Sequence, residues 1–171
     1  MPLFLPVSAI RPILKSIYKL IGPREIDMRE VAKYRNCFVC GDDNDCGLKA
    51  KFYALDDGSV VSEIVAGELH QGYKDVLHGG IVSAMLDEVM IKAVLAKDIF
   101  AVTAEMTVKF KKPVFTGQRI RFVGKIIEEK RRITRTEGTA ADEKGEEVAS
   151  ATATYIEARG ELKSVLTDSI E

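Results

Sequence analysis

The segment "VLHGGIVSAMLDEVMIKAVLA", residues 76–96, holds the residue types in this chain that are best suited to chemistry. His78, one of only two histidines, is followed by Gly79, Gly80 and a long apolar run. The first N–H groups of a helix lack intrahelical partners and carry the positive end of its dipole. Two glycines let a reacting group approach those N–H groups without a Cβ in the way. The pattern predicts an oxyanion site at the start of a helix, unless the glycines serve only close packing against a strand.

Two carboxylates, Asp87 and Glu88, interrupt the apolar run. Glu88 has Lys92 four residues later, in the order that favours a surface ion pair, whereas no residue three or four positions from Asp87 is charged. A desolvated carboxylate without a partner resists ionisation, and such a group is best tolerated where it serves a site. Asp87 is therefore the predicted general base or nucleophile. The structural alternative is that it only hydrogen-bonds a neighbouring strand or subunit.

The elements around this segment predict an α+β fold. Residues from Gly80 to about Lys97 are apolar on almost every side, as in a fully buried helix. An Asp56-Asp57-Gly58 turn predicts a hairpin before that helix. After the helix, alternating patterns predict antiparallel strands over 99–114, 118–130, 133–142 and 147–158. We expect a sheet of about six strands wrapped around one long central helix.

In the first strand after the helix, alternation predicts two distinct faces. Val102, Ala104, Met106, Val108 and Phe110 would share the apolar face, and Thr103, Glu105, Thr107 and Lys109 the polar one.

The chain divides into three predicted parts. Residues 1–35 form an appendage, residues 36–158 the main domain, and residues 159–171 a polar, loose tail. Apolar residues at helical spacing predict an amphipathic N-terminal helix from about Ser8 to Ile21. We expect this helix to dock on the main domain or a partner subunit; contact with a membrane surface and a targeting role are the alternatives.

Composition excludes several broad classes of protein. The net charge of −1 gives no sign of nucleic-acid binding, and the 46% apolar fraction is typical of a globular domain. No apolar stretch approaches the ~20 residues of a membrane-spanning helix. Three cysteines, an odd number, do not form a disulfide framework, which indicates a reducing, cytoplasmic location.

Three motifs resemble those of a known family. "CFVCGDDNDCGLKAKFY", "HQGYKDVLHGG" with Asp87 nine residues after His78, and "AVTAEMTVKFKKPVFTG" are similar to hotdog-fold acyl-CoA thioesterases. The resemblance is to the PaaI-like and thioesterase-superfamily-member-four-like branch, and it covers about residues 37–157. It implies hydrolysis of an acyl-CoA to a carboxylic acid and CoA without a metal or organic cofactor. It also implies a homodimer that assembles to a homotetramer.

The resemblance assigns roles to individual residues. The Gly79 amide, at the Gly79-Gly80 helix start, would hold the thioester oxygen, with His78 orienting or polarising it. Asp87 would act on a thioester bound to the other subunit, and Thr103 would help to position the attacking water.

The resemblance also implies that Gly72 belongs to the substrate site, and here the chain departs from many PaaI-like enzymes, which have an asparagine that holds the water. His70 and Gln71 could contribute there, although both are expected to be ordinary loop residues. Four basic residues at strand ends are candidates for binding the CoA phosphates, unless they are simply solvated: Lys111, Lys112, Arg131 and Arg132. The acyl-chain preference is left open.

The cysteines raise the question of a metal. Cys37, Cys40 and Cys46 have half the spacing of a zinc site, but no fourth ligand is dictated, although His70 is one candidate. Because "CxxCG" also occurs in the resembled family as a turn leading into a strand, we predict no metal.

Two other functions compete with thioester hydrolysis. Hotdog dehydratases carry a His-Phe-Pro signature or an Asp-x₄-His pair, and this chain has neither. A non-catalytic acyl-CoA-binding hotdog protein is the remaining alternative: Asp87 argues against it, and Gly72 slightly for it.

Overall fold

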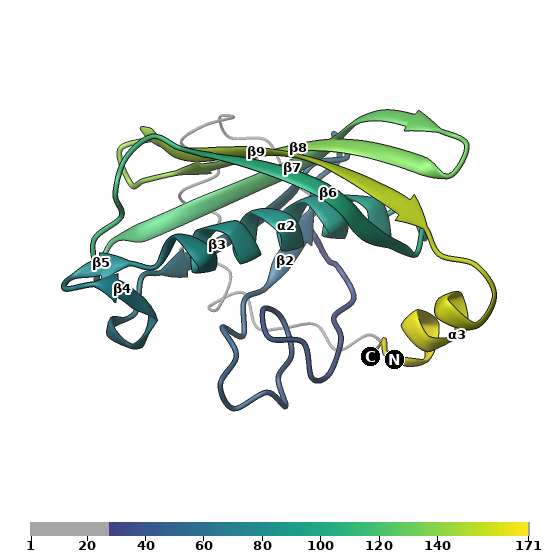
Figure 1. Cartoon of the computed structure of the whole chain (residues 1–171), viewed down its shortest axis with the longest axis horizontal. Coiled ribbons are helices and arrows are strands. Elements are labelled where there is room, and N and C mark those ends of the chain that lie inside the picture. The colour runs from purple at the N-terminus through teal and green to yellow at the C-terminus, as the bar shows by residue number, and fades with distance from the viewer. Residues whose placement is uncertain (1–27, 171) are drawn as a thin grey trace.

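The computed structural model describes residues 28–170 as one long curved antiparallel sheet, a central helix and a short second hairpin (Figure 1). The sheet order is β1-β2-β3-β7-β8-β9-β6, and β4 pairs separately with β5. The elements are β1 (Arg29–Glu30), β2 (Phe52–Ala54), β3 (Val60–Val65), the 3₁₀ helix η1 (Glu68–His70), β4 (Gln71–Tyr73), β5 (Val76–Leu77), α2 (Gly79–Leu95), β6 (Ala101–Phe110), β7 (Arg119–Lys130), β8 (Ile133–Ala141), β9 (Glu147–Glu157) and α3 (Gly160–Asp168).

Helix α2 lies along the concave side of the sheet, and its apolar residues form the centre of the core (Figure 1). Met85, Leu86, Val89, Met90 and Val94 are completely buried. Their partners come from β2, β3, β6, β7, β8 and β9, so the helix is covered by strands from both halves of the chain. The prediction of an antiparallel sheet wrapped around a central helix is confirmed, because a helix apolar on almost every side needs that cover.

Within residues 28–170 the main sheet has seven strands rather than about six. The additional strand is β1, whose two residues pair with Tyr53 and Ala54 of β2. Val31, directly after β1, is buried in the core. Residues from Arg29 onward are therefore part of the folded domain, although the sequence placed residues 1–35 in an appendage.

Strand β6 forms one edge of the sheet and departs from the predicted alternation. Its pairing with β9 shifts register between Thr103 and Glu105, which is a β-bulge. A bulge adds one residue to one strand, so side chains on either side of it change face. Thr103 thereby points to the helix, together with Met106 and Val108, whereas Val102 is exposed. The prediction that Thr103 lies on the face opposite Met106 is wrong for this reason.

The segment between β3 and α2 forms a small structure of its own that fixes the helix start. η1 leads into the β4–β5 hairpin, which lies beside the first turn of α2 (Figure 1). The Leu77 N–H donates to the Val114 carbonyl, and the His78 N–H donates to the His70 carbonyl, at 2.9 and 2.8 Å. Backbone bonds therefore hold both residues that precede the helix.

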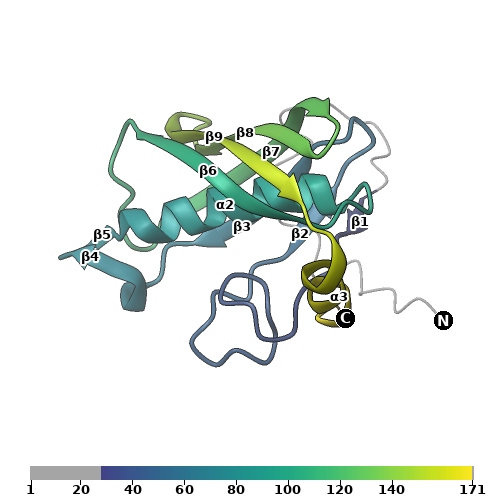
Figure 2. The same cartoon turned by 45° about the vertical axis from the view of Figure 1, so that its right-hand side comes forward.

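The C-terminal residues form helix α3, which corrects the expectation of a loose tail. α3 and the segment 32–50 lie on the side of α2 that faces away from the sheet (Figure 2). Ile170 forms a bridge with Tyr34 after the helix ends. The predicted amphipathic helix from Ser8 to Ile21 lies outside the described residues. Among residues 28–170, no helix is long and apolar enough to cross a membrane.

Candidate active site

The first turn of α2 leaves one backbone N–H unpaired. His78 is the N-cap in an extended conformation, and its Nδ1 accepts the Gly80 N–H at 2.8 Å. The His78 carbonyl accepts the Ile81 N–H at 2.9 Å. Within residues 28–170 the Gly79 N–H has no acceptor. The two glycines therefore have different roles. The Gly80 N–H is used in the helix cap, whereas the Gly79 N–H remains a free donor at the positive end of the helix.

This cap also defines the state of the His78 ring. A nitrogen that accepts a hydrogen bond carries no proton, so the ring proton of His78 is on Nε2. The imidazole is exposed to solvent, and its Nε2–H has no acceptor within residues 28–170.

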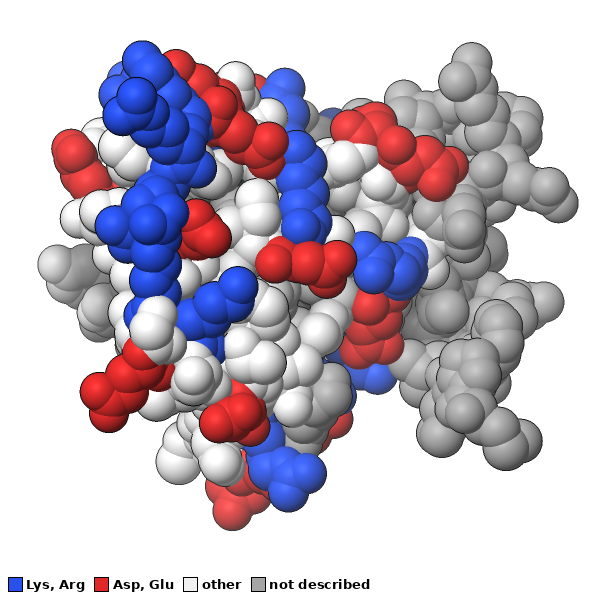
Figure 3. Space-filling model, turned by 90° about the vertical axis from the view of Figure 1, so that its right-hand side faces the viewer, with Lys and Arg blue, Asp and Glu red and all other residues white. Residues whose placement is uncertain are grey.

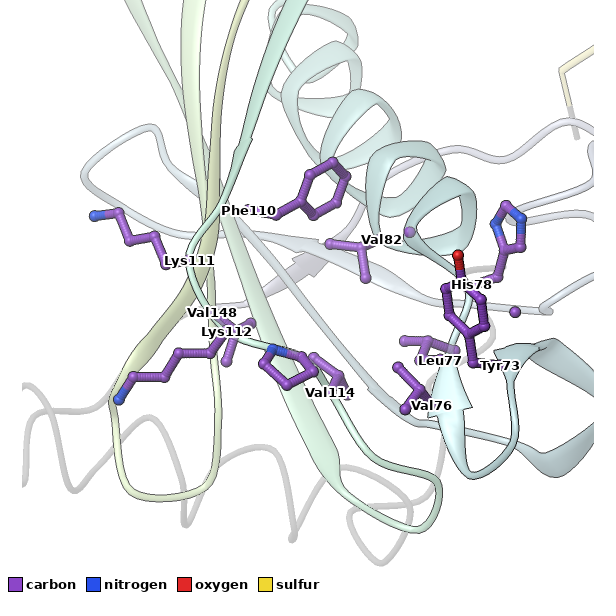
Figure 4. Close-up of a pocket in the computed structure, with 13 residues that line it drawn as sticks. Tyr73, Val76, Leu77, His78, Val82, Phe110, Lys111, Lys112, Val114 and Val148 are labelled. Carbon is purple, nitrogen blue, oxygen red and sulfur yellow. The ribbon is translucent and has the colours of Figure 1, made fainter.

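A cleft of about 650 Å³ opens at this helix start (Figure 4). Its wall is mainly apolar, and His78 and Gly79 stand at one side of it. The lining residues fall in the β4–β5 hairpin, the first turn of α2, the end of β6 and the segment after it, and Val148 of β9. No aspartate or glutamate is among these described lining residues. The cleft can therefore hold an apolar group next to the free Gly79 N–H, but it supplies no carboxylate of its own.

Gly72 lines the same cleft and packs directly against His78. A Cβ at position 72 would lie 3.0 Å from His78 Cδ2 and 3.2 Å from its Cα. An asparagine, which many PaaI-like enzymes have at this position, would thus need His78 to shift. The Gln71 side chain makes local hydrogen bonds: its Nε2 donates to the Glu68 carbonyl at 2.8 Å, and its Oε1 accepts the Asp75 N–H at 2.6 Å. These contacts give Gln71 the ordinary loop role that we expected.

Asp87 has partners, contrary to the sequence-based interpretation. The Thr103 hydroxyl donates to its Oδ1 at 3.0 Å, and the Tyr155 hydroxyl lies 2.9 Å from the same oxygen and 3.0 Å from the Asp87 carbonyl. These partners are 16 and 68 residues away, so helical spacing could not reveal them. The arrangement fixes the rotamer of the carboxylate and places the Thr103 hydroxyl in direct contact with Asp87.

Tyr155 is a site residue that the sequence did not indicate. It is completely buried in β9, and burial raises the pKa of its hydroxyl, as does the negative charge of Asp87. The hydroxyl therefore stays protonated and acts as a permanent hydrogen-bond donor. From the sequence alone, a tyrosine in the last strand is interpreted as an ordinary core residue. Only the fold shows that its hydroxyl contacts Asp87.

We expect Tyr155→Phe to lower the free energy of unfolding by ~1–3 kcal/mol, because the half-buried Asp87 carboxylate loses a fully buried donor. We also expect it to lower kcat more than it raises KM, since Asp87 would be less firmly held. Urea denaturation and steady-state kinetics measure the two effects. Tyr53→Phe is the matched control, because Tyr53 is also buried and its hydroxyl makes no hydrogen bond within residues 28–170. Equal losses in both variants would assign Tyr155 to packing alone.

A single chain does not bring Asp87 to the helix start. Asp87 follows Gly79 by eight residues, which is about 12 Å along a helix. It is absent from the lining of the cleft, and its partners Thr103 and Tyr155 are absent from that lining too. The structure therefore contains two separate half-sites, one with donors around Gly79 and one with the carboxylate of Asp87.

The four basic candidates also fall into two groups. Lys111 and Lys112 line the cleft beside His78, and they pair with Glu147 at 2.8 Å and Glu146 at 2.5 Å. Arg131 and Arg132 lie at the β7–β8 turn, in a different cleft of about 970 Å³. That second cleft is strongly basic, because it is also lined by Lys130, Arg135 and Arg159. Figure 3 shows Lys and Arg side chains gathered along one side of the end of the molecule that carries α3.

Comparisons with known proteins agree with this architecture. A family model, Thioesterase superfamily, matches residues 74–149. A solved thioesterase superfamily protein is 19% identical and has a TM-score of 0.69, over 92% of this chain and 81% of its own. A phenylacetic acid degradation-related protein from Ralstonia eutropha JMP134 is 27% identical with a TM-score of 0.58, over 64% of this chain and 85% of its own.

A third solved structure is a hypothetical thioesterase from Streptococcus pneumoniae TIGR4 with coenzyme A. It is 20% identical with a TM-score of 0.58, over 60% of this chain and 82% of its own. No curated protein matches the chain. The family match over residues 74–149 and the shared fold together show that this chain is similar to hotdog-fold proteins of the thioesterase superfamily.

Proposed function

We propose that this protein hydrolyses acyl-CoA thioesters, with the two half-sites supplied by different subunits of a dimer. The observation that carries the proposal is the unpaired Gly79 N–H, which lies at the positive end of α2 in a mainly apolar cleft. The thioesterase-superfamily match and the similar fold of a coenzyme A-bound protein support this substrate class.

The chemistry follows from the charge that develops on the substrate. Attack on a thioester places negative charge on the carbonyl oxygen, and the Gly79 N–H with the His78 Nε2–H would stabilise that charge. With Asp87 as general base, a water gives its proton to the carboxylate, attacks the carbonyl carbon, and CoA leaves as the thiolate. With Asp87 as nucleophile, a mixed anhydride forms first and water then hydrolyses it. Both routes need the carboxylate beside the carbonyl carbon.

Strand β6 provides the means to bring the two half-sites together. It is ten residues long and, within the described chain, pairs with β9 alone. A long edge strand with exposed apolar residues is a template for pairing with another chain, and Val102 and Phe110 are both exposed. β6 also connects the half-sites, because Thr103 contacts Asp87 while the Phe110 ring lies next to Gly79.

A two-fold axis near Met106 would therefore complete the site. Antiparallel pairing of β6 with its copy about this axis places the partner's Thr103 near Phe110, on the same side of the joined sheet. The partner's Asp87 would then approach the Gly79 N–H, and the second site would form by the same symmetry. Assembly of such dimers into a tetramer remains a prediction.

For the CoA phosphates, Lys111 and Lys112 are the better candidates. They stand at the rim of the cleft that contains Gly79, whereas Arg131 and Arg132 lie at the β7–β8 turn. The carboxylates that pair with both lysines are exposed or nearly so, so phosphate oxygens can replace them. Arg131 and Arg132 would contribute only to a phosphate that reaches them across the dimer.

One observation favours a second function, binding of acyl-CoA without turnover. The described cleft contains no carboxylate, and Gly72 supplies no side chain to hold a water. If no carboxylate from a partner subunit reached this cleft, the protein would bind acyl-CoA without hydrolysing it.

The two functions are separated by measuring thiol release and binding on the same preparations. We expect release of CoA from one or more of short-chain, long-chain and aromatic acyl-CoAs, at rates proportional to the dimer concentration. Calorimetry with the same compounds measures affinity independently of turnover. Tight binding with no thiol release from any acyl-CoA would replace hydrolysis with the binding function.

A further inference from the structure

The CxxC turn packs against α2 away from the active site and forms a cluster of possible metal ligands. The sulfurs of Cys37 and Cys40 and a carboxylate oxygen of Glu88 all lie within 4.8 Å of one another. Cys37 Sγ is 3.9 and 4.0 Å from the two Glu88 oxygens. The sequence raised Cys46 and His70 as further ligands, but Cys46 is exposed and neither belongs to this cluster. We propose that Cys37, Cys40 and Glu88 bind a zinc ion.

The distances suit zinc. Zn–S bonds of about 2.3 Å and Zn–O bonds of about 2.0–2.2 Å at tetrahedral angles separate neighbouring ligand atoms by roughly 3.5–3.8 Å. The observed 3.9 and 4.0 Å between Cys37 and Glu88 need only small side-chain rotations. Two thiolates in the set select zinc over the hard cations magnesium and calcium, which prefer oxygen ligands.

The backbone of the turn is built for this ligand pair. The Gly41 N–H donates to the Cys37 carbonyl at 2.9 Å. The Val39 N–H donates to the Cys37 Sγ at 3.3 Å. Position 41 can hold only glycine, because a Cβ there would lie 2.4 Å from the Arg35 carbonyl oxygen and 2.5 Å from the Cys37 nitrogen. Donors to ligand sulfurs orient the ligands and support the metal.

Lys92 is buried beside Glu88 rather than exposed at the surface, and its positive charge balances the charges of the proposed site. The sequence predicted a surface ion pair with Glu88, but the Lys92 side chain is 1% exposed and that of Glu88 is 13% exposed. The Lys92 Nζ lies 3.4 Å from Glu88 Oε1 and donates to the Ala32 carbonyl at 2.5 Å. Zn²⁺ with two thiolates, one carboxylate and this ammonium has zero net charge, which favours a site whose ligands are buried or half-buried.

A route for the metal also exists. A cleft of about 620 Å³ is lined by Cys37 and by residues at the C-terminal end of α3, such as Asp168. Cys37 is the one proposed ligand in the lining of this cleft, so solvent reaches the cluster from the Cys37 side and a water can take the fourth zinc position. The ion would join the segment 32–50 to the central helix, which makes it a structural site rather than part of the thioesterase chemistry.

The test measures metal directly in the full-length protein. After reduction, metal removal and dialysis, we expect the wild type to take up one Zn²⁺ per chain, and Co²⁺ to give the charge-transfer absorption of thiolate ligands. Cys37→Ser and Glu88→Gln should each weaken zinc binding by at least ~100-fold. Cys46→Ser is the control and should bind zinc as the wild type does. Added zinc should raise the melting temperature of the wild type and of Cys46→Ser only.

Several results would overturn the site. One is a reduced wild type that takes up no zinc, whether or not Cys37 and Cys40 form a disulfide in air. Another is zinc bound equally well by wild type and Cys37→Ser, which would place the ion elsewhere. Circular dichroism of Glu88→Gln, which keeps the shape of the side chain, separates loss of the ion from loss of the fold.

Discussion

Replacing Asp87 by asparagine is expected to lower kcat for acyl-CoA hydrolysis by at least ~10²-fold, because an amide can neither take the proton of water nor attack the thioester. The fold should be retained. The amide oxygen can still accept hydrogen bonds from Thr103 and Tyr155, which hold the carboxylate in the wild type. Thiol release under saturating acyl-CoA measures kcat, and circular dichroism with thermal melting measures the fold.

The matched control is Asp56→Asn, the same chemical change at an exposed position in the β2–β3 turn. It should leave kcat unchanged. If Asp87→Asn retained wild-type kcat, Asp87 would be a structural residue that anchors Thr103 and Tyr155, and the acid–base part of the proposal would be abandoned.

Replacing Gly79 by proline is expected to lower kcat by ~10²- to 10³-fold, the usual effect of removing one oxyanion donor. Proline lacks the N–H but suits the first position of a helix, where that N–H has no helical partner. His78 before it is extended, with φ −62° and ψ 129°, which a following proline tolerates. The substitution therefore removes the proposed donor and leaves α2 in place.

Gly79→Ala is the control for size. In either variant the added Cβ lies about 3.4 Å from the Phe110 ring, but alanine keeps the N–H. We expect Gly79→Ala to retain most of the activity. Equal losses in the two variants would mean that space beside Phe110, rather than the donor, is what Gly79 provides.

The sequence predicted the elements whose signals are local. The helix, expected from Gly80 to about Lys97 and observed from Gly79 to Leu95, follows from a long run of apolar residues. The hairpin around Asp56-Asp57-Gly58 follows from turn chemistry within a short window. The HGG segment and Asp87 were also recognisable as residue types suited to chemistry. Each of these inferences needs only neighbours along the chain.

What the sequence could not predict depends on contacts between distant segments. One extra residue at the Thr103–Glu105 bulge changes which face Thr103 occupies, and alternation alone gives no sign of it. Tyr155 reaches Asp87 across 68 residues. Lys92 and Glu88 have the spacing of a surface pair, yet the segment 32–50 covers them, and only the fold reveals that cover.

The central claim is that Asp87 of one subunit serves Gly79 of the other, and heterodimers of two inactive variants test it most directly. Asp87→Asn and Gly79→Pro chains, carrying different affinity tags, are co-expressed and the mixed dimer is purified. In this dimer one site combines an intact Gly79 with an intact Asp87, and the other site lacks both. The claim predicts about half of the wild-type dimer's activity, because two-fold symmetry gives one working site of two.

The control pairs Asp87→Asn with the double variant Asp87→Asn/Gly79→Pro, which contains no intact Asp87 and should stay inactive. If the acid instead served the helix start of its own chain, every chain of the first heterodimer would carry one defect. Restored thiol release in the first heterodimer alone is the result that the account predicts. A heterodimer as inactive as its two parents, or a fully active monomer, would contradict it.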